Sequence, residues 1–544
     1  MDDDVTASGT NAPAVVSSRH VIDLPTGPLS YRADAGTVQV RRDDGSALAD
    51  VFYLAYRAEG EAEPARGGSW GEAPRARGAV RSGNTGGFGD AGPARNTGGF
   101  GSAASFGDTG PASEDVVPRP VTFAFNGGPG SASLWLNVGG FGPRRAPTKA
   151  PDHTPPAPHE FGDNPYTLLP STDLVFLDAP GTGFSRISPD ARPEEAWGVD
   201  QDVDIFARAI TRYLTITGSW RAPRYLLGES YGTARAAALV HKLQNQGLDF
   251  NGVILLSAIL NWATTQPGLD QGYINLLPSY AAAAHYHGKA PGGGRQPGLD
   301  AFVADARRFA AGRYAQALQL GDTLPADKEQ EVATLLSQFT GLDPALLRRC
   351  RLRVEMEDFR TLLLADEGKV IGRFDARFTA ERPYAAGVGS SGSAVTDPAT
   401  NDAATAGVNG AHLAGFHHHL AQDLGYHSSL HYRPLHNVAI EGAWDWRHKA
   451  PGIDAPLQVP NVSLDLAAAM RRNPALRVRV MGGFYDLATP FAGAEFDVSH
   501  LHLGPALRPN VTFSWYRSGH MTFVDEKAIA EMSRDLHEFY ASGT

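Results

Sequence analysis

The stretch RYLLGESYGTARAAALVHKL, residues 224–243, decides the fold of this chain. It begins with a short apolar run, RYLLG, and continues from Tyr231 with Ala and Leu at helical spacing. Between the two, GESYG fits the pattern G-x-S-x-G with Ser230 at its centre. Small residues on both sides of the serine permit a sharp strand-to-helix turn that leaves the hydroxyl clear at the top of a sheet. The stretch therefore predicts a nucleophilic serine; the alternative is an ordinary serine at a helix start.

Four further apolar runs follow the same pattern: VTFAF (121–125), DLVFLD (173–178), NGVILLSAI (251–259) and VRVMGGF (478–484). None of them alternates between apolar and polar residues, which is typical of strands that are covered on both faces. Because helical patterns lie between the runs, we predict an α/β fold with a mainly parallel central sheet. Upstream, residues 20–56 alternate and are punctuated by Gly, Asp and Pro, which indicates an antiparallel meander.

Changes in composition divide the chain into four parts. Residues 1–17 read as a flexible tail, and residues 18–264 and 441–544 as the two parts of the α/β core. Residues 265–440 are mostly helical in pattern and too many for a loop inside a compact domain. We therefore predict a helical cap, inserted into the core, that covers the carboxyl ends of the strands.

Two stretches rich in small residues are predicted to be irregular. Within the first part of the core, residues 58–115 contain the near-repeat NTGGFG, whose copies begin at Asn84 and Asn96. Two copies are too few and too rich in glycine for a repeat architecture, so we expect a flexible surface insertion. Within the cap, a Gly- and Ser-containing stretch at 386–410 is expected to interrupt the helices.

The charge and composition exclude several classes of function. The 544 residues carry 48 basic and 59 acidic side chains, a formal net charge of −11, which argues against a nucleic-acid-binding protein and against attraction to an anionic membrane. No apolar stretch approaches the roughly 18 residues of a membrane span. The first residues, MDDDVTASGT, lack the basic and apolar regions of a signal peptide. We expect a cytoplasmic protein, or a secreted or periplasmic one if a leader has been removed.

A nucleophilic serine needs a base, and the base needs an acid that orients it. The last apolar run ends in GGFYD, which places Asp486 just past a strand end, and a later strand-like run ends in SGH, at His520. The chain order Ser230, Asp486, His520 is the order found in α/β-hydrolases. An oxyanion hole needs two donors. The candidates are the backbone N–H of Tyr231 and the glycine-rich loop NGGPG at 126–130.

Five blocks of the sequence resemble, in order and spacing, the signature blocks of the serine carboxypeptidases, peptidase family S10: FNGGPGSASLWLNVGGFGP, DLVFLDAPGTGFS, YLLGESYGT, GGFYDLATP and SGHM. The resemblance spans residues 121–265 and 440–525, and the stretch PSYAAAAHYHGK at 278–289 is similar to the bacterial branch of the family. It implies an enzyme that releases C-terminal amino acids from peptide substrates through an acyl-enzyme intermediate and needs no metal or cofactor.

The resemblance also implies a role for each site residue. Ser230 attacks the substrate, His520 transfers the proton and Asp486 holds the imidazole. Gly128 and Tyr231 supply the N–H groups of the oxyanion hole. The first three are the side chains that the chain order indicates independently.

Recognition of the substrate's terminal carboxylate is the second implied role, and here the sequence departs from the family. The resemblance assigns this role to Asn126 and Glu229. A carboxylate beside an acidic side chain is tolerated only if one of the two is protonated, which explains the family's preference for acid pH. The family's second acid is replaced by Gly140, and Arg144 and Arg145 follow closely. We expect one of these arginines to bind the carboxylate directly, with exopeptidase specificity kept and the preference for acid pH weakened.

Three alternative functions stay open at this point. The absence of an acid at Gly140 makes an esterase or acyltransferase on the same scaffold plausible. A hydrolase-like module that only binds its ligand would have a broken triad, whereas all three members are present here. A general endopeptidase is disfavoured because a capped site with Asn126 and Glu229 suits a chain end. The sequence does not determine the preferred side chain at the cleavage site or the oligomeric state.

Four other features are interpreted as structural. The single cysteine, Cys350, excludes an intramolecular disulfide and a Cys-based zinc site. The histidines at 417–419 cannot all face one metal ion and read as loop residues, so we predict no metal site. The stretch APGTGFSR at 179–186 lacks the Gly-Lys-Ser/Thr of a phosphate loop and reads as a wall beside the triad. The WDW at 444–446 either lines a substrate pocket or packs in the core.

Overall fold

The computed structural model describes residues 15–59, 118–290, 298–382 and 402–542. Most of the predicted tail, and nearly all of the Gly-rich insertion predicted at 58–115, lie outside these residues. Among the helices of the described part, none is both long enough and apolar enough to cross a bilayer.

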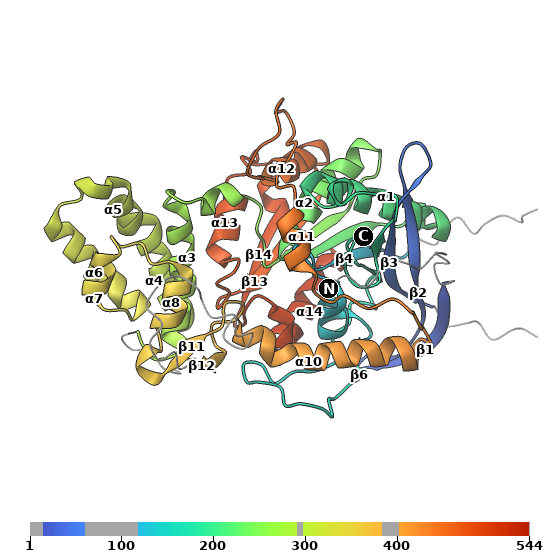
Figure 1. Cartoon of the computed structure of the whole chain (residues 1–544), viewed down its shortest axis with the longest axis horizontal. Coiled ribbons are helices and arrows are strands. Elements are labelled where there is room, and N and C mark those ends of the chain that lie inside the picture. Colours follow the sequence, from blue (N-terminus) through green and yellow to red (C-terminus); the bar gives the residue numbers. More distant parts are fainter. Residues whose placement is uncertain (1–14, 60–117, 291–297, 383–401, 543–544) are drawn as a thin grey trace, which may run out of the picture. The chain divides into compact units, whose positions relative to one another are not determined.

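The core of the described chain is one sheet, whose strands run in Figure 1 from β1 at the right to β13 and β14 near the middle. Its strands follow the order β1-β2-β3-β7-β4-β9-β10-β13-β14, and β8 pairs with β3. Their bounds are β1 (Val16–Leu24), β2 (Gly27–Arg41), β3 (Ala47–Ala58), β4 (Val121–Phe125), β7 (Asp173–Leu177), β8 (Arg186–Ile187), β9 (Arg224–Glu229), β10 (Gly252–Leu256), β13 (Arg477–Gly483) and β14 (Val511–Tyr516).

The pairing of the strands confirms the predicted sheet. The strands β1, β2 and β3 form the antiparallel meander. From β7 to β14 every neighbouring pair is parallel, and the five apolar runs of the sequence correspond to β4, β7, β9, β10 and β13. A mainly parallel sheet with helices around it, whose nucleophile turn follows a central strand, is the α/β-hydrolase fold.

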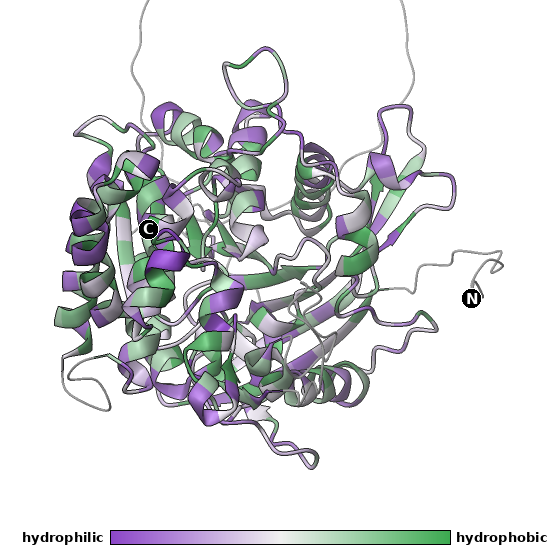
Figure 2. Cartoon of the chain, turned by 60° about the vertical axis from the view of Figure 1, so that its left-hand side comes forward, coloured by the Kyte–Doolittle hydropathy of each residue, from purple (hydrophilic) through white to green (hydrophobic). Residues whose placement is uncertain are grey.

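Helices cover both faces of the sheet, which is why its strands are apolar without alternation. Successive side chains of a strand point to opposite faces; Phe123 of β4 therefore packs in one hydrophobic cluster and Ala124 in the other. The first cluster contains buried side chains of α1 (Val199–Thr217), α2 (Tyr231–Asn245) and α12 (Ser463–Arg472). The second includes α14 (Glu526–Ala541), α10 (Ala403–His418) and the π-helical turn η1 (Trp135–Phe141). Figure 2 shows hydrophilic residues mainly on outer helix faces and loops.

Most of the residues between β10 and β13 are helical, in agreement with the pattern of the sequence. The elements are α3 (Gln271–Tyr286), α4 (Leu299–Phe309), α5 (Ala315–Leu320), α6 (Ala326–Thr340), α7 (Pro344–Arg349), α8 (Met356–Leu362), β11 (Lys369–Ile371), β12 (Thr379–Glu381), α10 and α11 (Asn437–Ala443). The helices α3 to α8 pack around a third hydrophobic cluster, which also takes in Phe491 at the start of α13 (Phe491–Ser499). The predicted domain boundaries remain a prediction.

The expectation that residues 386–410 interrupt the helices is wrong over its last part, because α10 begins at Ala403. Asp402 caps this helix: its carboxylate accepts hydrogen bonds from the Thr405 N–H (2.7 Å) and hydroxyl. Gly407 serves close packing rather than a break, since a Cβ at this position would lie 2.7 Å from the Phe378 ring. Residues 386–401 lie outside the described part.

The interpretation of the three histidines as loop residues is also wrong. His417 and His418 end α10, and His419 begins the π-helical turn η8 (His419–Asp423). His419 is fully buried and both its ring nitrogens are partnered, Nδ1 with Asp423 at 2.7 Å and Nε2 with the Tyr56 hydroxyl at 2.9 Å. A buried polar ring with two partners stabilises the packing of η8 on β3. In the described residues, no group of three or more His, Cys, Asp or Glu side chains could hold a metal ion.

Candidate active site

Ser230 occupies the sharp turn between β9 and α2 that the sequence predicts. Its backbone has φ 60° and ψ −129°, a conformation that a residue with a Cβ adopts only when its surroundings impose it. Its N–H donates to Leu256 O in β10 (3.0 Å). A Cβ at Gly228 would lie 2.0 Å from Gly232 O, and one at Gly232 would lie 2.7 Å from Phe125 O. The two glycines of GESYG therefore allow the strand, the turn and the helix to pack this closely.

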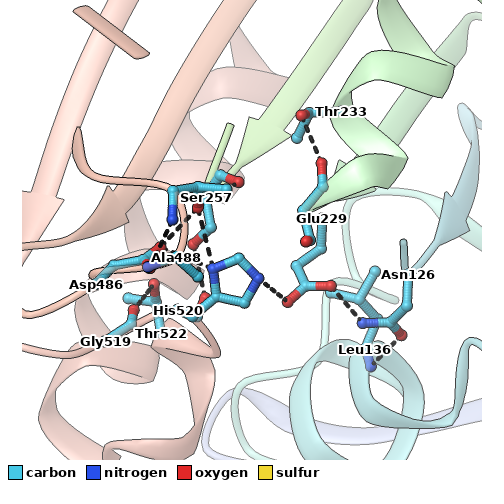
Figure 3. Close-up of polar contacts among 12 residues, drawn as sticks. Asn126, Leu136, Glu229, Thr233, Ser257, Asp486, Ala488, Gly519, His520 and Thr522 are labelled. Atoms are coloured by element: carbon cyan, nitrogen blue, oxygen red, sulfur yellow. Dashed lines mark hydrogen bonds and ion pairs between the residues drawn. The ribbon is translucent and has the colours of Figure 1, made fainter. Parts of the chain in front are cut away.

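His520 and Asp486 form a buried pair beyond the ends of β14 and β13. The distance from His520 Nδ1 to Asp486 Oδ2 is 2.8 Å (Figure 3). The Asp486 carboxylate also accepts hydrogen bonds from the Ala488 N–H (2.8 Å), the Thr489 N–H (3.0 Å) and the Thr489 hydroxyl (2.7 Å). Burial alone would lower the pKa of His520, but the charge and hydrogen bond of Asp486 outweigh it, so that the pKa is raised. The pair can hold the ring in one orientation and stabilise its protonated form.

Glu229, the last residue of β9, lies beside the other nitrogen of His520. Its Oε1 is 3.7 Å from His520 Nε2, and its Oε2 accepts a hydrogen bond from Asn126 Nδ2 (2.8 Å), as Figure 3 shows. Asn126 is held in turn by the Leu136 N–H, which donates to its side-chain oxygen (3.1 Å). Burial raises the pKa of Glu229, although the charge of His520 and the hydrogen bond from Asn126 act in the opposite direction. A protonated Glu229 could donate a hydrogen bond to a substrate carboxylate.

Gly128 and Tyr231, the two candidate oxyanion donors, line the same cavity as Ser230. Tyr231 is the first residue of α2, where helix N–H groups lack partners within the helix. Gly128 has φ 107°, which favours glycine. Within the described part of the chain, neither N–H donates a hydrogen bond. Both are thus available to an oxyanion.

One cavity of about 570 Å³ brings the predicted residues together. Six of the seven line it: Asn126, Gly128, Glu229, Ser230, Tyr231 and His520. The seventh, Asp486, supports His520 from behind. Among the described residues, Ser230 Oγ has no hydrogen-bond partner, so its bond to His520 is not formed in this state. Such catalytic hydrogen bonds often tighten only when substrate binds.

Aromatic side chains form much of the wall next to Ser230, and they resolve the two readings of the WDW stretch. Trp446 lines the cavity and lies 5.7 Å, between ring centroids, from Trp262, which also lines it. Trp444 is buried and packs edge-on against Tyr231 at 5.3 Å. One tryptophan therefore faces the pocket and the other packs in the core.

Arg144 and Arg145 do not reach this cavity, and the expectation that one of them binds the terminal carboxylate is wrong. Arg144 forms an ion pair with Asp163 and lies 3.4 Å from Asp423. Arg145 is buried and pairs with Glu526 at 2.6 Å. Each arginine is thus neutralised by an acid from a distant part of the sequence, which the local pattern GGFGPRR could not reveal.

The cavity nevertheless lacks the acid that the family has at the position of Gly140. Gly140 lies in η1, where a Cβ would be 3.4 Å from the ring of Phe523, and it does not line the cavity. Within the described part of the chain, the acidic side chains that line the cavity are Glu229, Asp402 and Glu441.

Three residues that the sequence reasoning missed lie at the site. Phe374 stacks on the His520 ring, with centroids 4.8 Å apart, and its carbonyl oxygen accepts a hydrogen bond from the backbone N–H of His520 (2.5 Å). Arg373 precedes it and lines the cavity. The hydroxyl of Thr489 lies 3.0 Å from His520 Nδ1 and bonds Asp486. Thr489 could have been found, because it lies three residues after Asp486 in the GGFYDLATP block; residues 373 and 374 carry no such signal.

One comparison with known proteins agrees with the resemblance seen in the sequence. The model of the serine carboxypeptidase family, Peptidase_S10, matches residues 111–273, which confirms the resemblance over that stretch. No curated protein matches the chain.

Several solved structures are similar to the chain at low sequence identity. Proline iminopeptidase from Mycobacterium smegmatis is 17% identical, with 79% of this chain and 92% of that chain covered and a TM-score of 0.31. A lipase in its open form is 11% identical, with 93% and 98% covered and a TM-score of 0.34. An acetylester hydrolase from Corynebacterium glutamicum is 10% identical, with 97% and 96% covered and a TM-score of 0.29.

Proposed function

We propose, from the serine carboxypeptidase match over residues 111–273, that this hydrolase is a serine-type carboxypeptidase that releases C-terminal amino acids from peptides. The observation that carries the proposal is the single cavity shared by Ser230, His520, Glu229 and Asn126. A nucleophile, a base and a pair of groups suited to a terminal carboxylate are thereby within reach of one substrate.

The proposed reaction proceeds through an acyl-enzyme. Ser230 Oγ attacks the last peptide carbonyl while His520 Nε2 takes the hydroxyl proton. The N–H groups of Gly128 and Tyr231 stabilise the oxyanion. The C–N bond then breaks, and His520 gives the proton to the leaving amine. Water, deprotonated by the same histidine, hydrolyses the ester and restores Ser230.

Asn126 and Glu229 are proposed to hold the terminal carboxylate of the leaving residue. The amide of Asn126 donates, and Glu229 donates when it is protonated. The raised pKa of Glu229, which follows from its burial, extends the pH range over which it carries the proton. The 3.7 Å between Glu229 Oε1 and His520 Nε2 places this recognition beside the group that protonates the leaving amine.

Glu229→Gln is expected to change the alkaline side of the pH profile. For a free-carboxylate peptide, kcat/KM of the wild type falls as pH rises and Glu229 loses its proton; the glutamine amide donates at every pH, so this fall should disappear. On the acid side Glu229 is protonated and uncharged, so the substitution removes no charge next to His520 and should leave the acid limb in place. Profiles of kcat/KM from pH 4 to 9, with an ester that lacks the carboxylate as control, measure both limbs. An unchanged profile on the peptide would contradict the assigned role.

The proposed function is tested with an N-blocked dipeptide and the matching N-blocked amino-acid methyl ester, scanned from pH 4 to 8. Release of the C-terminal amino acid supports a carboxypeptidase. Cleavage of the ester alone would indicate the esterase or acyltransferase, and cleavage within a longer, C-terminally amidated peptide would indicate an endopeptidase. If none of these cleavages occurs, the result favours the hydrolase-like module that only binds its ligand.

A further inference from the structure

Arg373 is a cationic side chain of the cavity that has no assigned role. Among the residues that line the cavity in the described part of the chain, it is the one Lys or Arg. Its side chain is exposed, and within the same described residues it forms no ion pair and no side-chain hydrogen bond. The guanidinium carbon lies 5.5 Å from the centroid of the Phe374 ring, but its N–H groups have no acceptor among the described residues and can donate to a ligand in the cavity.

Hydrogen bonds hold the backbone around Arg373, so its side chain projects into the cavity from a fixed point of the chain. The N–H groups of Arg373 and Phe374 both donate to Asp402 Oδ1, at 2.9 and 3.2 Å. Phe374 in turn stacks on the His520 ring, and its carbonyl oxygen accepts a hydrogen bond from the backbone N–H of His520. The segment is therefore fixed between the start of α10 and the candidate base.

The arrangement also indicates on which side of the cavity Arg373 lies. His520 must protonate the leaving amine, so the groups around its ring flank the leaving residue. The guanidinium carbon of Arg373 lies 5.5 Å from the centroid of the Phe374 ring, and that ring stacks on His520 with centroids 4.8 Å apart. Arg373 and Glu229 therefore both line the part of the cavity next to the ring that protonates the leaving amine.

We infer that Arg373 binds the terminal carboxylate of the substrate, together with Asn126 and Glu229. Its positive charge complements the carboxylate directly, whereas the acid that the family has at the position of Gly140 does not. The inference rests on the proposed function. A guanidinium matches a carboxylate in a two-point, charge-assisted hydrogen bond. The arginine that was expected near Gly140 in the sequence is thus provided by the helical insertion instead.

The other charges in the cavity leave this role open to Arg373. Asp402 already accepts hydrogen bonds from the N–H groups of Arg373, Phe374 and Thr405. Glu441 is exposed; burial raises its pKa and the charge of Arg373 acts in the opposite direction, but within the described residues the two side chains form no ion pair. Because a guanidinium stays charged at all working pH values, it also explains how carboxylate recognition could persist above the acidic range.

The test compares Arg373→Gln and Arg373→Lys on two substrates, the N-blocked dipeptide with a free carboxylate and the matching N-blocked amino-acid methyl ester. We expect Arg373→Gln to lower kcat/KM for the dipeptide about 10- to 100-fold, mainly through KM, and to change ester cleavage less than about threefold. Arg373→Lys should recover part of the loss. The matched control is Arg212→Gln, an exposed arginine of α1, which should change neither activity.

An equal loss on both substrates would overturn the inference, because it would indicate a structural role, and so would unchanged activity on the dipeptide. A wild type that cleaves only the ester would overturn the proposed function itself. In that case inhibition of ester cleavage by the dipeptide decides the inference: weaker inhibition of Arg373→Gln, by about tenfold or more, supports it, and equal inhibition of the two enzymes overturns it.

Discussion

Ser230→Ala is expected to reduce peptide and ester cleavage by about 10⁴- to 10⁶-fold in kcat, with KM nearly unchanged. The reason is that no other hydroxyl occupies the turn between β9 and α2, where the candidate base, the two free N–H groups and the cavity meet. The substitution should leave the fold intact. Alanine meets the same backbone restriction at φ 60° as serine, and within the described residues the Ser230 hydroxyl makes no hydrogen bond that would be lost. Initial rates and a thermal melt measure the two expectations.

Ser131→Ala is the matched control, because Ser131 lines the same cavity and differs from Ser230 in lying away from the strand-to-helix turn. Its activity should stay within a few-fold of the wild type. Activity of Ser230→Ala above about one per cent would show that another group, or an activated water, attacks the substrate. A large loss in both variants would show that the assay responds to the shape of the cavity rather than to the nucleophile.

The parts of the fold that the sequence could predict are those governed by neighbouring residues. The run VTFAF becomes a strand because both of its faces are buried, and the glycines of GESYG mark a turn because a Cβ at either would collide with backbone. The same local rules place Asp486 and His520 just past strand ends. Where the role of a residue depends on neighbours a few positions away in the chain, the sequence pattern is enough to predict that role.

The parts that could not be predicted depend on partners far along the chain. Asp402 caps α10 in a stretch whose glycines and serines suggested a break, and Gly407 in this helix permits contact with the ring of Phe378. Arg145 forms an ion pair with Glu526, more than 300 residues away in the sequence. Arg373, in contrast, lies at the cavity because hydrogen bonds to Asp402 and from His520 hold the backbone of its segment. A single sequence does not show which acid neutralises which arginine, and that pairing decides which cation remains free for a substrate.

Asp486→Asn is expected to lower kcat about 10⁴-fold while the protein stays folded. The Asp486 Oδ1 accepts the N–H groups of Ala488 and Thr489, so the asparagine must keep its oxygen there and turn its NH₂ toward His520. That NH₂ can only donate to His520 Nδ1, which forces the ring proton onto Nε2, and Nε2 then cannot take the proton of Ser230. The loss of the Asp486 charge should also lower the pKa of His520, since that charge raises it in the wild type. The acid limb of kcat/KM is therefore expected to move to lower pH.

The matched control is Asp497→Asn, which changes a buried carboxylate away from the triad. Asp497 Oδ2 accepts two backbone N–H groups, from Leu260 and Asn261, at 3.1 Å each, and burial raises its pKa to about 7. Because the wild-type group carries a proton for much of the time near neutral pH, asparagine should replace it with kcat within a few-fold. A loss below about tenfold for Asp486→Asn would mean that the carboxylate does not select the tautomer of His520. An equal loss in both variants would mean that changing any buried carboxylate of this region disturbs the structure, and that the loss in Asp486→Asn does not report on the orientation of the histidine.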